Sequence, residues 1–264
     1  MSIPELSWDP SVFQDPEGGT IILWPYLPCV RMPAQMRPRD WDGLALILSR
    51  DGLDAIREEE IQDQQSHGVH TESAAASGTT LGMLVKDLQD LDLEGPAIPD
   101  PEPIRLLHHA ENSRGGMPVY SIEPELDDEN WADWLARCAD QQVRLTNLIA
   151  TIGRSKRWAK ARRAAIPKVG SSRCVDADLG AAATVCAAWW LEEGSALTPE
   201  LVAERDQRLA ARLRGALANL RDSRIDESEA SGPKLLAPIQ QAHLPALRAC
   251  LESHIEPEGV EAEG

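Results

Sequence analysis

The sequence predicts a mainly α-helical protein: a bundle of four to six helices with a small, irregular N-terminal part that carries one or two short β-strands. Alanine and leucine, which favour helices, dominate its apolar residues, and β-branched residues are sparse. Apolar residues also recur at steps of three and four in several stretches, which places them on one helix face. The hydrophobic content of 42% over 264 residues is enough to bury a core.

Residues 1–18 contain three prolines and are predicted to form an extended arm, anchored on the body of the protein by Trp8 and Phe13. Residues 20–27 (TIILWPYL) are the best strand candidate in the chain. Because Pro25 cannot donate a hydrogen bond to a neighbouring strand, this strand is expected to be short or to lie at a sheet edge.

Helices are then predicted for residues 41–49, with Asp40 as N-cap, for residues 53–65 and for residues 80–93. The small and polar residues 66–79 favour a flexible loop between the last two. Residues 94–125 contain six prolines, which favours an extended linker, with a second short strand at residues 119–122.

Residues 127–167 carry the clearest helical pattern. Their apolar stripe begins at Trp131 and ends at Ile152, and after Gly153 six cations follow with no acid among them. Because a core face cannot be lined with unpaired cations, either the helix breaks at Gly153 or it runs past the globule as a cationic ridge.

The rest of the chain is predicted to be helical. Asp176 or Asp178 is expected to cap a helix that ends at Gly194, and Thr198, followed by proline, to cap one that runs to about residue 221. An acidic loop at residues 222–232 precedes a last helix at residues 235–254, which is broken or kinked near its two prolines.

These elements divide the chain into four predicted parts: an N-terminal arm, strand and helices (1–94), a proline-rich linker (95–126), a C-terminal helical domain (127–254) and a frayed acidic tail (255–264).

Charge is strongly segregated along the chain. The formal net charge is −17 and the pI is near 4.7, yet eight of the 26 basic residues lie between Arg154 and Arg173. The five cysteines are widely spaced and odd in number, which is typical of free thiols in a reducing compartment. The N-terminal residues lack a signal-peptide pattern, and no stretch is long and apolar enough to span a membrane. We therefore expect a cytoplasmic protein.

This basic stripe is the main predicted binding site. Three readings remain open: it grips a nucleic-acid backbone, it docks an acidic protein, or it pairs with the chain's own acids. Trp8, Phe13 and Trp24 are further candidates, as anchors for a partner. The stripe consists of Arg154, Lys156, Arg157, Trp158, Lys160, Arg162, Arg163, Lys168 and Arg173.

No motif predicts a catalytic residue, a metal, a cofactor or a small-molecule ligand. His67 and His70 lack a third ligand nearby, and the glycine pairs belong to no phosphate-binding pattern. Cys29 is predicted to be the least buried thiol, yet a cysteine nucleophile is not favoured.

The sequence therefore favours a non-catalytic adaptor or scaffold subunit of a larger assembly, whose basic stripe docks an acidic protein partner. The alternatives are a nucleic-acid-binding component that uses the same stripe, and an enzyme whose site is assembled from distant residues. The oligomeric state and the identity of the partner are not encoded in any visible pattern.

Overall fold

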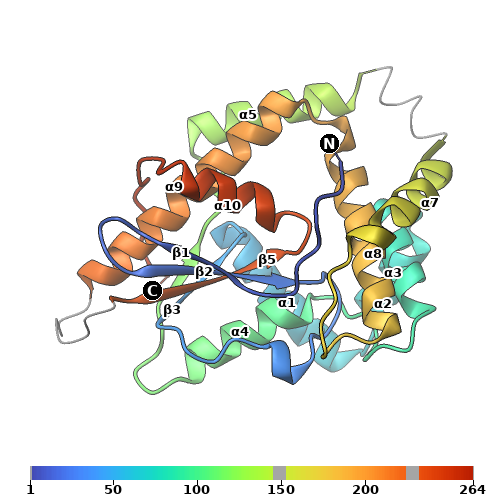
Figure 1. Ribbon diagram of the computed structural model, residues 1–264, viewed down its shortest axis with the longest axis horizontal. Coiled ribbons are helices and arrows are strands. Elements are labelled where there is room, and N and C mark those ends of the chain that lie inside the picture. Colours follow the sequence, from blue (N-terminus) through green and yellow to red (C-terminus); the bar gives the residue numbers. More distant parts are fainter. Residues whose placement is uncertain (1, 145–152, 224–231, 264) are drawn as a thin grey trace.

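A five-stranded mixed β-sheet, covered by helices on both faces, forms the centre of the protein (Figure 1). The computed structural model describes residues 2–144, 153–223 and 232–263. The predicted helical bundle is therefore wrong: the chain has an α/β fold in which helices and a central sheet share the core.

Four of the five strands run parallel, in the order β1-β2-β5-β3-β4. The strand β1 pairs antiparallel with β2 at one edge, while β5 pairs in parallel with both β2 and β3. The strand β4 pairs in parallel with β3 at the other edge. The bounds are β1 Ser11–Gln14, β2 Thr20–Tyr26, β3 Gly43–Leu46, β4 Val119–Ser121 and β5 Lys234–Gln240.

Side chains alternate between the two faces of the sheet, as the period of a strand requires. In β5, Leu235 and Ala237 join the core beneath α9 (Pro199–Asp222) and α10 (Leu244–Glu252). Leu236, between them, joins the second core on the opposite face. Both faces of the central strands are thus buried.

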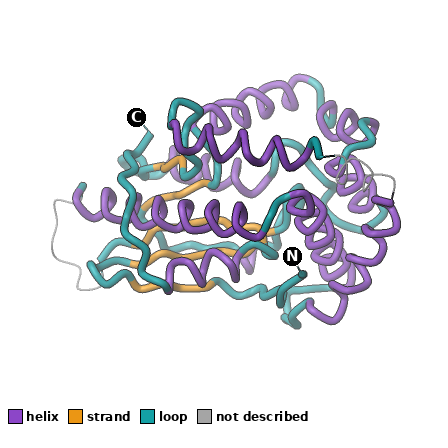
Figure 2. The backbone as a smooth tube through the Cα atoms, turned by 90° about the horizontal axis from the view of Figure 1, so that it is seen from above, coloured by secondary structure: helices purple, strands orange, loops and turns teal. Residues whose placement is uncertain are grey.

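The second core is covered by helices from the middle of the chain. It includes residues of α1 (Arg50–Gln65), α3 (Thr80–Gln89), α4 (Pro101–Asn112), α7 (Arg154–Ala165) and α8 (Ala177–Glu193). In Figure 1, α8 stands across the end of the sheet toward which the parallel strands point. Viewed from above, the strands lie side by side in one half of the molecule, and helices fill the other half (Figure 2).

Several predictions that depend on local signals are confirmed. The helix α3 and the strand β4 lie where expected, and Asp176 and Thr198 cap α8 and α9 through their side chains. Gly153 is the N-cap of α7, so α7 begins there, while α5 (Glu129–Gln142) ends before it. The apolar residues predicted at 145–152 lie outside the described residues.

Four local predictions are wrong. Residues 43–46 form β3 instead of a helix, and residues 234–240 form β5. The predicted loop at 66–79 contains α2 (Val69–Ala76), and the predicted linker contains α4. Short apolar runs fit a buried strand as well as a helix, and only their neighbours in the sheet decide between the two.

The strand β2 is also not at an edge, despite its proline. Its neighbour β1 reaches only as far as Leu23, so Pro25 lies beyond β1, where β2 pairs with β5 alone. The missing backbone N–H of proline is tolerated at such a position because no neighbouring strand lies on one side of β2 to accept its hydrogen bond.

Both ends of the chain are held on the body. Leu6 forms a bridge with Val169, and the indole of Trp8 donates to Gly170 O at 2.8 Å. The predicted tail is docked as far as Glu263, whose backbone N–H donates to Val119 O at 2.8 Å.

The sheet takes strands from the first three predicted parts of the chain, so these parts share one core layer. No helix within the described residues is long and apolar enough to cross a membrane.

Candidate functional site

A pocket of about 510 Å³ opens at the carboxyl ends of the parallel strands. After β3 the chain continues into α1 on one face of the sheet, and after the adjacent β5 it continues into α10 on the other. Such a switch in direction leaves a crevice between neighbouring strands, where ligands of open α/β sheets commonly bind. Leu46 at the end of β3 and Gln240 at the end of β5 both line this pocket.

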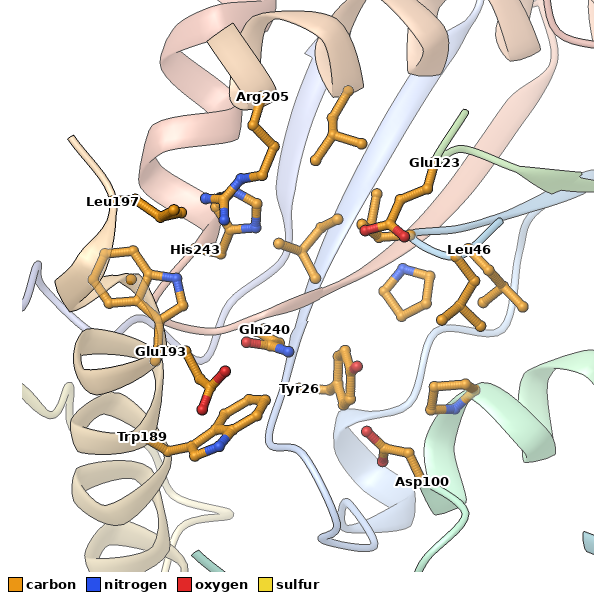
Figure 3. A pocket seen from close by; sticks show the side chains of 18 of the residues that line it. Tyr26, Leu46, Asp100, Glu123, Trp189, Glu193, Leu197, Arg205, Gln240 and His243 are labelled. Carbon is orange, nitrogen blue, oxygen red and sulfur yellow. Dashed lines mark hydrogen bonds between the residues drawn. The ribbon is translucent and has the colours of Figure 1, made fainter. Parts of the chain in front are cut away.

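One wall of the pocket carries Asp100, at the N-terminus of α4. Its Oδ1 accepts a hydrogen bond from Cys29 N at 3.2 Å, and Cys29 has a left-handed backbone with φ of 62°. Burial raises the pKa of the Asp100 carboxyl to about 7. Tyr26 lies beside it (Figure 3), and burial, followed by the charge of Asp100, raises the pKa of the Tyr26 hydroxyl well above its usual value. A carboxyl with such a pKa can both donate and accept protons near neutral pH.

Glu123 enters the pocket from the segment after β4. Its backbone N–H donates to Leu48 O at 3.1 Å, which fixes the segment beside the end of β3. Burial raises the pKa of its carboxyl, and the charge of Arg205 only partly opposes this shift. Within the described residues, the Glu123 carboxyl has no hydrogen bond or ion pair.

His243, which follows β5, forms a buried pair with Asp206 of α9. His243 Nε2 lies 2.8 Å from Asp206 Oδ1, and Arg205 Nε donates to the same oxygen at 2.9 Å. Burial would raise the pKa of Asp206, but the hydrogen bond from His243 and the charges of His243 and Arg205 hold it below its usual value. The carboxylate of Asp206 therefore orients both the His243 ring and the Arg205 guanidinium at this end of the pocket.

Aromatic side chains form much of the remaining wall. Trp189 and Trp190 come from the C-terminal turns of α8, and Trp134 comes from α5. Trp134 is fixed by a hydrogen bond from its indole Nε1 to Leu201 O at 3.0 Å and by stacking on Trp131. The pocket thus combines large apolar surfaces with a few polar groups, as small-molecule sites do.

Most of the predicted basic stripe lies on α7, away from this pocket, and half of its cations pair within the chain. Arg154 and Arg157 both pair with Glu192. Arg162 pairs with Asp87 at 2.8 Å, and the same carboxylate accepts a hydrogen bond from the buried indole of Trp158.

The rest of the stripe is more open. Lys168 pairs with Glu5, and Arg173 is exposed. Lys156, Lys160 and Arg163 are exposed on one face of α7 and have no ion pair within the described part of the chain.

The three predicted anchors are buried in this chain's own core: Trp8 is 5% exposed, Phe13 7% and Trp24 0%. The thiol of Cys29 is also buried, not the most open one, and burial raises its pKa well above the usual value. His67 and His70 belong to no group of three or more metal-ligating side chains, and none occurs among the described residues.

Sequence reasoning missed every polar residue of the pocket. Tyr26, Glu123 and His243 each end or closely follow a strand, which is a recognisable signal, but β3 and β5 were not predicted. Without those strands, nothing in the sequence brings Asp100 near Glu123.

Comparison with known proteins gives no further guide: no family model, no curated protein and no solved structure matches this chain.

Proposed function

We propose that this protein is an enzyme that binds a small organic molecule in the pocket and moves protons with Asp100 and Glu123. The observation that carries the proposal is the position of the pocket at the carboxyl ends of β3 and β5, where the chain leaves the sheet on opposite faces. This proposal replaces the expectation of a non-catalytic adaptor without a small-molecule ligand.

The chemistry of the lining residues supports acid–base catalysis. Two carboxyls with raised pKa values face one cavity, and groups of this kind concentrate where enzymes transfer protons. The lining cysteine, Cys138, is buried and its pKa is raised, so the pocket offers proton transfer instead of thiol nucleophilic attack.

A pocket-filling variant tests the binding step. Gln240 lies near the centre of the pocket (Figure 3), so Gln240→Trp should occupy its volume, whereas Gln89→Trp places the same side chain on the exposed surface of α3. We expect ligand-observed NMR with a library of small fragments to detect binding to the wild type and Gln89→Trp but not to Gln240→Trp. Fragments that bind all three proteins equally, or none of them, would overturn the proposal.

The catalytic step is tested by incubating the same proteins with a mixture of small metabolites and following its composition by mass spectrometry. At least one compound should be consumed by the wild type and by Gln89→Trp. The same compound should not be consumed by Gln240→Trp or by Glu123→Gln. Equal consumption by Glu123→Gln would remove that carboxyl from the chemistry.

A second candidate function keeps the docking of an acidic protein partner on α7. Lys156, Lys160 and Arg163 favour it, because they follow one another at helical spacing on the exposed face. Changing all three to glutamate should abolish capture of a co-purifying acidic partner without unfolding the protein. Salt-dependent binding of the wild type to DNA or RNA would favour nucleic acid instead.

A further inference from the structure

We propose that the ligand of this pocket is an organic cation, an amine that enters the pocket in its protonated form. The inference rests on the proposed function above and names the class of molecule that the site selects.

Three carboxyl side chains from three separate elements surround the cavity: Asp100 from the start of α4, Glu123 after β4, and Glu193 at the end of α8 (Figure 3). Glu193 accepts a hydrogen bond from the Thr80 hydroxyl, and Asp100 from a backbone N–H. Within the described residues none of the three carboxyls forms an ion pair, although the charge of Arg205 acts on Glu123. Asp100 and Glu123 are partly buried, whereas Glu193 is exposed at the rim. Burying a carboxylate without a counter-charge is unfavourable, and a ligand with a positive charge would supply that charge to Asp100 and Glu123.

The Arg205 guanidinium in the pocket does not balance these carboxyls. Arg205 and His243 both contact the carboxylate of Asp206, the residue that follows Arg205 in α9. The charge of Arg205 is thus compensated by the adjacent carboxylate of Asp206, whereas none of the three carboxyls has an ion pair within the described residues. A negatively charged ligand would meet more repulsion than attraction here.

The aromatic wall suits the same class of ligand. Trp189, Trp190, Trp134 and Tyr26 line the cavity that the carboxyls surround. The faces of indole and phenol rings attract cations, most strongly where water is excluded. An aromatic wall would also stack on a neutral sugar ring, so the excess of carboxyls is what favours the amine.

The arrangement of the carboxyls argues against a single bound metal ion. No three metal-ligating side chains in the described part of the chain approach one another closely enough to share one. The carboxyls are instead spread around the cavity, so that they would contact different parts of one organic molecule.

Three probes of nearly the same shape test the inference: benzylamine is positive at neutral pH, benzyl alcohol is neutral, and benzoate is negative. Titration of the full-length protein by calorimetry should give an affinity for benzylamine about ten-fold higher than for benzyl alcohol, with benzoate weakest. Glu123→Gln should lower the affinity for benzylamine and leave that for benzyl alcohol unchanged. Glu72→Gln, which removes an exposed carboxylate of α2, is the matched control and should change neither.

The possible outcomes separate the two proposals. If benzyl alcohol or benzoate binds at least as tightly as benzylamine and Gln240→Trp blocks that binding, the proposal of a cationic ligand is wrong, while the proposal of a small-molecule pocket is retained. If none of the three probes binds, or if Gln240→Trp leaves their binding unchanged, both proposals fall.

Discussion

Replacing Gly215 with alanine tests how closely the C-terminal segment packs on α9. A Cβ at this position would lie 1.7 Å from Glu258 O and 2.7 Å from Glu258 C. Both are backbone atoms, so no side-chain rotation can relieve the overlap. The segment around Glu258 must therefore move away from the helix.

The displacement has a calculable cost. It breaks the hydrogen bond from Glu258 N to Ala211 O, worth about 1 kcal/mol, and overpacking of this kind costs about 1–3 kcal/mol. It also strains the ion pairs of Glu258 with Arg208 and Arg212. Alanine is favoured over glycine inside a helix by about 1 kcal/mol, which offsets part of the loss. We expect a net loss of about 2 kcal/mol, or a decrease in Tm of roughly 4–8 °C.

Urea denaturation followed by tryptophan fluorescence measures this loss, and hydrogen exchange of residues 253–263 locates it. The matched control is Gly180→Ala in α8, where the nearest side-chain atom, Val175 Cγ1, lies 4.0 Å from the new Cβ. This variant should gain up to about 1 kcal/mol. If Gly215→Ala proves as stable as Gly180→Ala, with unchanged exchange in the tail, the close packing is refuted.

Three further outcomes follow from the charged groups. The pKa of Asp100 rises from 3.8 to about 7 on folding, so its contribution to stability is complete below pH 4 and is lost as the pH rises toward 7. Between pH 4 and 7, the urea midpoint of Asp100→Asn should therefore rise relative to that of the wild type. Midpoints that change with pH in the same way for both proteins would contradict the raised pKa of Asp100. Asp15→Ala leaves the buried Arg214 guanidinium without its carboxylate and should lower the free energy of unfolding by about 3–5 kcal/mol. The control Glu17→Ala breaks only the more exposed pair with Arg221 and should cost less than about 1 kcal/mol. Equal losses in the two variants would show that the burial of the Asp15–Arg214 pair does not matter. Arg162→Glu places a negative charge opposite Asp87 and should lower Tm. The control Lys160→Glu lies on the exposed face of α7 and should leave Tm unchanged. A comparable decrease in both variants would mean that α7 packs on the protein with another face.

At several positions that carry a local signal, prediction from sequence succeeded, although Asp40, a predicted N-cap, precedes the strand β3 instead of a helix. Asp176 and Thr198 cap their helices because a short polar side chain can bond the free N–H groups of the first turn, whatever the rest of the fold does. The strand at 20–26 was found from its β-branched residues and its flanking glycines.

Two of the four failures lie where a segment is short and mostly apolar, and the other two are the helices α2 and α4, which lie in a small, polar segment and in a proline-rich one. Residues 43–46 and 234–240 read equally well as buried helix or buried strand, and proline at 238 favoured a kinked helix. Pairing decided the outcome: β3 pairs with β5 only as far as Leu236, so Pro238 lies past that ladder, where it removes no hydrogen bond from it. Missing these two strands turned an α/β fold into a predicted bundle.

The sequence by itself determined the caps, most helices and the segregation of charge, since each depends on residues a few positions apart. The tertiary structure alone decided that half of the cations on α7 meet acids from distant helices, and that Asp100, Glu123 and His243 face one cavity. These three residues are brought together by β2, β3, β4 and β5, and the pairing of strands far apart in the sequence depends on mutual burial, which no local pattern encodes.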